Sequence, residues 1–85
     1  MDKMMLRVIV GDEIRARREA QHLSLQDLAI MSGTSYTHLW KIEKGKVSVG
    51  LDLLGRVCEA LDLPLYEVFS KVDGPASSVT VEYQG

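Results

Sequence analysis

The sequence is poor in features that would assign it to several large classes of protein. Cysteine occurs once, at Cys58, which excludes an internal disulfide. Its place in an apolar helical pattern predicts a buried, unreactive thiol. No apolar run approaches the roughly 20 residues of a membrane-spanning helix, because Arg7 interrupts the stretch 4–10. With no pattern typical of an exported protein, we expect a cytoplasmic protein without membrane association.

The residues of catalytic and metal sites are present only in unsuitable arrangements. His22 and His38 lie sixteen residues apart, and neither has a cysteine or an acidic cluster at metal-ligand spacing. Gly45 and Lys46 are adjacent, but the glycine-rich loop of a phosphate-binding motif does not precede them. We therefore expect no enzyme activity, no cofactor and no metal.

Charge is unevenly divided along the 85 residues. The net charge of −2 by itself disfavours nucleic-acid binding, which depends on neutralising phosphates. Residues 1–46 nevertheless carry eight basic and six acidic side chains, a balance of +2, whereas residues 47–85 have a balance of −4. The N-terminal half is therefore better suited to a polyanionic partner, and we expect modest affinity that depends on dimerisation.

The stretch 23–46 has the pattern of two short helices joined by a tight turn. Ser24 and Ser35 are suited to cap the two N-termini, because each hydroxyl accepts a hydrogen bond from an otherwise unpaired backbone N–H. Gly33 is suited to a turn with positive φ, and Gly45 to ending the second helix. Apolar residues recur at helical spacing on one face of the pair: Leu25, Leu28, Ala29, Leu39 and Ile42.

The opposite face of the second helix is rich in hydrogen-bond donors. It carries Tyr36, Thr37, His38, Trp40, Lys41 and Lys44. A rigidly held helix with such a face is suited to the major groove of double-stranded DNA, which admits a helix and displays acceptors on the base edges.

This stretch resembles the helix-turn-helix family of phage repressor and Cro proteins, also called xenobiotic-response-element-like. The matching residues are Leu23-Ser24, Leu28-Ala29, Gly33, Leu39, Ile42-Glu43, Gly45 and Lys46. The resemblance extends from about residue 10 to about residue 69. It implies an all-α, five-helix, repressor-like DNA-binding domain at 6–70, with its motif at about 24–45, followed by a short C-terminal tail at 71–85.

The resemblance also implies roles for individual side chains. Base-edge contacts are implied for Tyr36, Thr37 and Lys41, on the helix whose first turn, starting at Ser35, enters the groove. Contacts to the DNA backbone are implied for a second set: Ser24, Gln26, His38, Trp40, Lys44 and Lys46. For Trp40, a partly buried packing residue and an anchor for a protein partner are open alternatives.

Two further positions carry expectations from the resemblance. In this family an arginine at the place of Arg18 pairs with the glutamate before the closing glycine, here Glu43, and so pins the first helix to the second motif helix. The alternative is that Arg18 belongs to a solvated basic face together with Arg15 and Arg17. The family usually has glutamine where this chain has Leu25, so that phosphate contact is lost or passes to backbone N–H groups.

The remaining helices are predicted from apolar spacing. A first helix should end near Gln21, and its buried stripe consists of Leu6, Val10 and Ile14. Its start is open, because Gly11 and the β-branched stretch 8–10 weaken a helix and also allow an extended segment. A fourth helix is predicted at about 51–61, with an inward stripe of Leu51, Leu54, Val57, Cys58 and Leu61. We identify no internal repeat.

Leu53 falls outside that stripe and is expected to make an apolar contact outside the core. Pro64 is suited to the first turn of a short fifth helix, and Leu65, Val68 and Phe69 are expected to close the bundle.

The tail changes character after a turn-rich stretch at 73–78. Apolar and polar residues then alternate over 78–83, which is a strand pattern. Such a strand would pair with its copy in a second subunit or with an extended segment at 6–10. The alternative is a tail without fixed structure.

Together these patterns predict a sequence-specific DNA-binding transcriptional regulator, a homodimer whose two motif helices read a palindromic operator. The alternative is a protein-interaction module of the same fold, such as an antitoxin or an adaptor with a protein partner. The net acidity, Leu25 and Trp40 favour this alternative.

Overall fold

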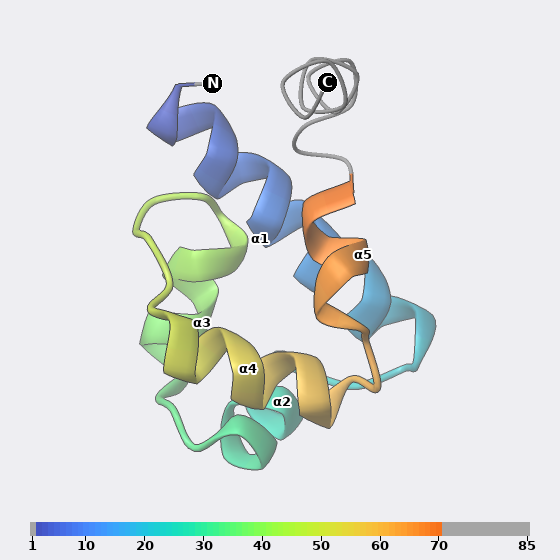
Figure 1. The fold of residues 1–85 in the computed structure, drawn as a ribbon. Helices are drawn as coiled ribbons and strands as arrows, with labels where there is room; N and C mark the ends of the chain where they lie inside the picture. The colour runs from blue at the N-terminus through green and yellow to red at the C-terminus, as the bar shows by residue number, and fades with distance from the viewer. Residues whose placement is uncertain (1, 71–85) are drawn as a thin grey trace.

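The computed structural model describes residues 2–70, which form a bundle of α-helices (Figure 1). The helices are α1 (Lys3–Ala20), α2 (Leu25–Ser32), α3 (Tyr36–Glu43), α4 (Leu51–Ala60) and α5 (Leu65–Ser70). The predicted all-α, five-helix architecture is confirmed for the described part of the chain. The tail at 71–85 and its strand pattern lie outside the described residues.

The long helix α1 organises the packing of the others. It contacts α3 along one part of its length and α5 along another, while α2 contacts both α3 and α4. In Figure 1, α4 crosses the lower half of the molecule near α2, and α5 lies beside the C-terminal half of α1.

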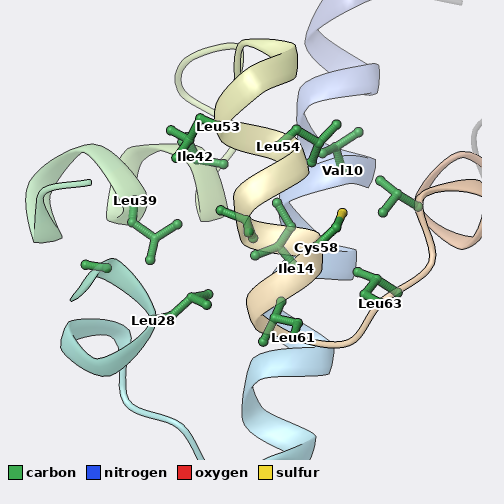
Figure 2. Close-up of a cluster of buried hydrophobic side chains, with 13 residues drawn as sticks. Val10, Ile14, Leu28, Leu39, Ile42, Leu53, Leu54, Cys58, Leu61 and Leu63 are labelled. Carbon is green, nitrogen blue, oxygen red and sulfur yellow. The ribbon is translucent and has the colours of Figure 1, made fainter. Parts of the chain in front are cut away.

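All five helices contribute side chains to one apolar core. In Figure 2, Ile14 of α1, Leu28 of α2, Leu39 of α3 and Leu61 after α4 point toward a common centre. The complete cluster is Val10, Ile14, Leu28, Ala29, Leu39, Ile42, Leu53, Leu54, Val57, Cys58, Leu61, Leu63 and Val68. Fully burying one such side chain stabilises a fold by about 1.5–3 kcal/mol, so this cluster supplies the main support for the motif helices.

The start of α1 decides one of the alternatives left open by the sequence. Asp2 is the N-cap, and its carboxylate accepts a hydrogen bond from the Met4 N–H at 2.9 Å. The β-branched stretch 8–10 is helical, because packing of Val10 in the core outweighs its weak helix propensity. The extended alternative is therefore wrong, and so is a strand pairing between the tail and residues 6–10.

The inward faces of α4 and α5 differ from their predicted stripes. Leu53 is buried at 9% exposure, whereas Leu51 is 77% exposed, so the two exchange places relative to the prediction. Leu65 and Phe69 are also exposed, at 47% and 38%, and Val68 is the α5 residue that is buried. The shift arises because α4 and α5 are short, and the helices they pack against decide which apolar residues face inward.

The two corners that join α1 to α2 and α4 to α5 repeat one another. Residues 19–28 and 59–68 share the pattern Glu-Ala-x-x-Leu-x-Leu-x-acidic-apolar, at an offset of forty positions. Each corner contains a non-glycine residue at positive φ, His22 at 58° and Asp62 at 52°. The expectation of no internal repeat is therefore wrong at the scale of this ten-residue unit.

Backbone hydrogen bonds of the Schellman type close both corners. The Leu23 and Leu63 N–H groups each donate to the carbonyl oxygen five residues earlier, at 3.1 and 2.9 Å. The Gln21 side-chain amide donates to the Leu61 carbonyl oxygen. These two residues occupy equivalent positions in the repeated unit, so the corners are joined directly to each other.

Candidate nucleic-acid interface

Local hydrogen bonds set both ends of α2 and the start of α3. Ser24 and Asp27 form a reciprocal capping box: the Ser24 hydroxyl accepts from the Asp27 N–H at 2.9 Å, and the Asp27 carboxylate accepts from the Ser24 N–H at 3.1 Å. Gly33 ends α2 at φ 72°, as predicted. The Ser35 hydroxyl then accepts from the His38 N–H at 3.1 Å. The turn between α2 and α3 is therefore fixed by its own sequence.

The side chains of α3 separate onto two faces. Leu39 and Ile42 are buried in the core. On the opposite side, Tyr36 is 50% exposed, and Thr37 and Lys41 are also exposed. The other predicted contact residues are also accessible to different degrees: Ser24, Gln26, Ser35, Trp40, Lys44 and Lys46 are exposed, and His38 is half-buried.

Arg18 fixes α1 to the C-terminal end of α3. Its Nε and Nη2 donate to the two carboxylate oxygens of Glu43, at 2.8 and 3.0 Å, and its Nη1 donates to the Leu23 carbonyl oxygen at 2.8 Å. The structure thus places Arg18 and Glu43 together, and the hydrogen bonds that Arg18 donates to the Glu43 carboxylate raise the pKa of Arg18. One guanidinium therefore holds three segments: α1, the first corner and α3.

The same ion pair shapes the charge of the candidate interface. Glu43 is the one acidic residue of α3, and it is only 6% exposed because Arg18 covers it. The accessible charges at this end of α3 are those of Lys41, Lys44 and Lys46. The segment 41–46 therefore exposes only basic charges in a chain whose net charge is −2, and such charges attract phosphates.

A close approach between α1 and α3 was not anticipated from the sequence. A Cβ added to Gly11 would overlap the Ile42 carbonyl oxygen and lie 2.9 Å from that of Glu43. One added to Gly45 would lie 2.9 Å from the Val8 side chain. Gly11 lies three residues before the buried Ile14, a spacing that puts both on one helix face. That spacing is the signal that was missed.

The C-terminal end of α3 carries a cluster of one aromatic ring and two ammonium groups. The Lys44 Nζ lies 5.9 Å from the centroid of the Trp40 ring, and the Lys46 Nζ lies 5.6 Å from it. Trp40 itself is 37% exposed. Neither lysine contact was predicted, although the spacing of four residues from Trp40 to Lys44 places them on the same helix face.

Leu25, which replaces the usual glutamine of the family, is half-buried and packs against the core. Its side chain therefore adds to the anchoring of α2. Residues 2–70 bring no three potential metal ligands together. Among the helices described, none has the length and apolar character needed to cross a bilayer.

Two short helices meeting at a glycine turn, with the second exposed along one face and pinned at its end, define a helix-turn-helix domain. The family model of that description matches residues 14–68. The chain belongs to the helix-turn-helix family, in its Cro/C1-type branch.

Individual relatives agree with this assignment. The transcriptional regulator ClgR of Mycobacterium tuberculosis is 34% identical over 61 residues, which are 72% of this chain and 54% of that protein. This chain spans about half or less of the length of the curated relatives it matches.

Two crystal structures share both sequence and fold with this chain. The clp gene regulator ClgR from Corynebacterium glutamicum superposes with a TM-score of 0.72 at 33% identity, covering 74% of this chain and 81% of that one. The restriction-modification controller protein C.AhdI from Aeromonas hydrophila has a TM-score of 0.72 at 32% identity, covering 74% and 96%.

Proposed function

We propose that this chain is a sequence-specific DNA-binding transcriptional regulator that acts as a homodimer on a palindromic operator. The observation that carries the proposal is the outward face of α3. Exposed donors stand on a helix whose inner face is anchored in the core and whose one acidic side chain is buried in an ion pair. A helix with this presentation suits the major groove, and the names of the relatives support the same function.

In this proposal α3 is the recognition helix. Lys41 donates to guanine O6 and N7, Thr37 meets a thymine methyl group or a base acceptor, and Tyr36 donates to a neighbouring base edge. Contacts to phosphate and sugar orient the domain without reading sequence. These contacts are assigned to Ser24, Gln26, Ser35, His38, Lys44 and Lys46.

An apolar groove beside the end of α3 supports the homodimer. The groove has a volume of about 200 Å³, and its lining includes Leu6, Val10, Val49, Leu51 and Phe69. Leu51 at 77% exposure is unusually accessible for a leucine. Because the loop after α3 forms one wall of the groove, a second copy docked there would place both recognition helices next to the dimer interface, and a twofold dimer matches the symmetry of a palindromic operator.

Selection of bound sequences from a random duplex pool, followed by titration at several salt concentrations, tests the proposal. We expect a palindromic consensus and a log K that falls linearly with log salt. Lys41→Gln should reduce discrimination at one base position by about 1–3 kcal/mol, whereas Lys46→Gln should weaken all duplexes alike and lower the salt slope by about 1. Binding that is independent of salt, with no sequence preferred over random duplex, would contradict the proposal.

The dimer is tested separately by sedimentation velocity. Leu51→Glu places a charge in the groove and should shift the protein to monomer, while Ile30→Glu alters an exposed apolar residue of α2 outside the groove lining and serves as the matched control. A Leu51→Glu variant that remains dimeric would exclude this face as the dimer interface.

The protein-interaction module is the alternative function. Two of the features that favoured it have contacts within the chain, because Leu25 packs on the core and Trp40 contacts two lysines. The net acidity remains in its favour. Reversing the charges of Lys41 and Lys44 separates the two functions: a regulator loses operator binding, whereas an antitoxin or adaptor retains a stoichiometric protein partner.

A further inference from the structure

Trp40 is the aromatic residue of α3 that points to the end of the helix where the lysines gather. Both the Lys44 and the Lys46 ammonium groups lie within the roughly 6 Å over which a cation is attracted to the face of an aromatic ring. The indole is more than half covered. The structure therefore shows that two charged side chains of the same chain lie against Trp40. The sequence had predicted a contact with the DNA backbone, with packing in the core and anchoring of a protein partner as alternatives.

The lysines need such a contact for a physical reason. Lys41, Lys44 and Lys46 are three like charges within six residues, and each long side chain loses rotamer freedom when its ammonium binds a phosphate. An aromatic face attracts the ammonium and limits those rotamers before DNA arrives. It occupies one side of the ammonium and leaves N–H donors on the other side for an anion.

The backbone at the C-terminal end of α3 also attracts the lysine ammonium groups. Lys44 is the C-cap of α3 and Gly45 follows it at φ 71°, so the ammonium groups lie near the negative end of the helix dipole. The Arg18 ion pair removes Glu43 as a competing partner for these lysines. The ring and the helix end are thus the local groups that hold the cluster.

We propose that Trp40 is a positioning residue that holds Lys44 and Lys46 ready for the phosphate backbone of DNA and acts through these lysines, without reading bases itself. This inference rests on the proposed DNA-binding function. In this inference the indole increases affinity for every DNA sequence alike, whereas Tyr36, Thr37 and Lys41 determine which base sequence is preferred.

The first test needs no DNA. Ring currents of the indole should shift the ε-methylene proton resonances of Lys44 and Lys46 upfield in the NMR spectrum of the free protein, while Lys41, which has no such contact with the ring, provides the internal reference. Trp40→Leu, which keeps an apolar side chain but has no π face, should abolish the shift. Trp40→Phe should retain part of it. Unshifted Lys44 and Lys46 signals in the wild type would overturn the inference, whatever the chain does with DNA.

The second test uses operator and random duplex side by side. Trp40→Leu should weaken binding to both by a similar factor, roughly 5–20-fold, because two lysine side chains must then be ordered on binding, with the order of preferred sequences unchanged. Trp40→Phe should recover most of the loss. A changed sequence preference in Trp40→Leu would show that the ring contacts bases and would overturn the inference.

A double-variant background separates action through the lysines from direct contact. In a Lys44→Gln, Lys46→Gln protein, Trp40→Leu should cause no further loss of affinity. A further loss as large as that in the wild-type background would mean that the indole touches DNA itself, and would overturn the inference. If the wild type shows no salt-dependent DNA binding, the proposed function fails, while the ring-current experiment still decides whether Trp40 orders the lysines.

Discussion

The corner between α1 and α2 and the corner between α4 and α5 share a sequence pattern and a backbone path, yet the helices that follow them are held differently. After the first corner, Ser24 and Asp27 form a capping box, and Arg18 donates to the Leu23 carbonyl oxygen. These bonds lead into α2, whose eight residues support the recognition helix. The first corner is thus reinforced by a capping box and by the Arg18 guanidinium.

The second corner has fewer side-chain bonds of this kind. Pro64 takes the place of Ser24, and the six-residue α5 that follows buries Val68 but leaves Leu65, Tyr66 and Phe69 accessible to solvent. Its charged link to α1, from Arg17 to Glu67, is about a third accessible to solvent. The shared backbone of the corners sets the direction in which the next helix leaves. The additional side-chain bonds of the first corner provide the rigidity that the proposed DNA-reading half requires.

The largest expected effect comes from removing the guanidinium that reinforces the first corner. Arg18→Ala leaves the carboxylate of Glu43 buried without its partner, and the free energy of unfolding should fall by roughly 3–5 kcal/mol. Arg17→Ala removes the more exposed ion pair and should cost about 1 kcal/mol or less. Urea denaturation of both variants measures the difference. Equal losses would contradict the asymmetry between the two corners.

Gly11 in α1 and Gly55 in α4 compare a glycine that lies against another helix with one that does not. Gly11→Ala forces a methyl group against the end of α3 and should destabilise the fold by about 1–3 kcal/mol. Gly55→Ala is the matched control, because a Cβ there meets nothing within 4 Å. It should stabilise the fold by up to about 1 kcal/mol through helix propensity. Thermal unfolding of the two variants checks the opposite signs; a stabilising Gly11→Ala would show that α1 and α3 separate without cost.

A smaller effect tests what the two corners have in common. His22→Gly and Asp62→Gly each relieve a non-glycine residue of a left-handed conformation. Each should stabilise the protein by about 0.5–1 kcal/mol, after the greater chain entropy of glycine in the unfolded state is deducted. Chemical denaturation should give matching gains for the two variants. A gain at one corner and a loss at the other would mean that the corners are not equivalent.

The smallest effect is a pH dependence of the free energy of unfolding. It concerns Arg18 and Cys58, whose carbonyl oxygens accept the backbone hydrogen bonds that close the two corners. Burial raises the pKa of the Cys58 thiol, so its contribution to stability is complete below the ordinary thiol pKa of about 8.5 and is lost as the pH rises through the folded-state value. Its counterpart Arg18 stays charged throughout this range. We expect the free energy of unfolding to fall between pH 8.5 and 10 in the wild type, and to fall less in Cys58→Ala. Identical slopes would contradict this assignment.

The parts of the fold predicted from sequence are those with local causes. Caps at Ser24 and Ser35 and turns at Gly33 and Gly45 act over a few residues, so the sequence around them is sufficient. Pairing of Arg18 with Glu43 spans 25 positions and was accessible only through the family resemblance.

The features that were missed depend on a neighbouring helix. Leu51 and Leu53 are both compatible with an apolar stripe on a ten-residue helix, and the packing of α4 selects between them. From the sequence alone, Gly11 is a residue that weakens α1. In the structure, the absence of a Cβ at Gly11 allows the end of α3 to pack against α1. The contact of Trp40 with two lysines depends on side-chain rotamers. The assignment of base-edge contacts to Tyr36, Thr37 and Lys41 stays a prediction.

The three-way junction at Arg18 also limits how the domain opens. Moving α1, the first corner or α3 away separates the guanidinium from at least one of its hydrogen-bond partners, and loss of α1 or α3 exposes a charge that the fold keeps buried. These segments should therefore fray together. Amide hydrogen exchange in native conditions should show α1 and α3 exchanging with one shared opening free energy, above that of α5.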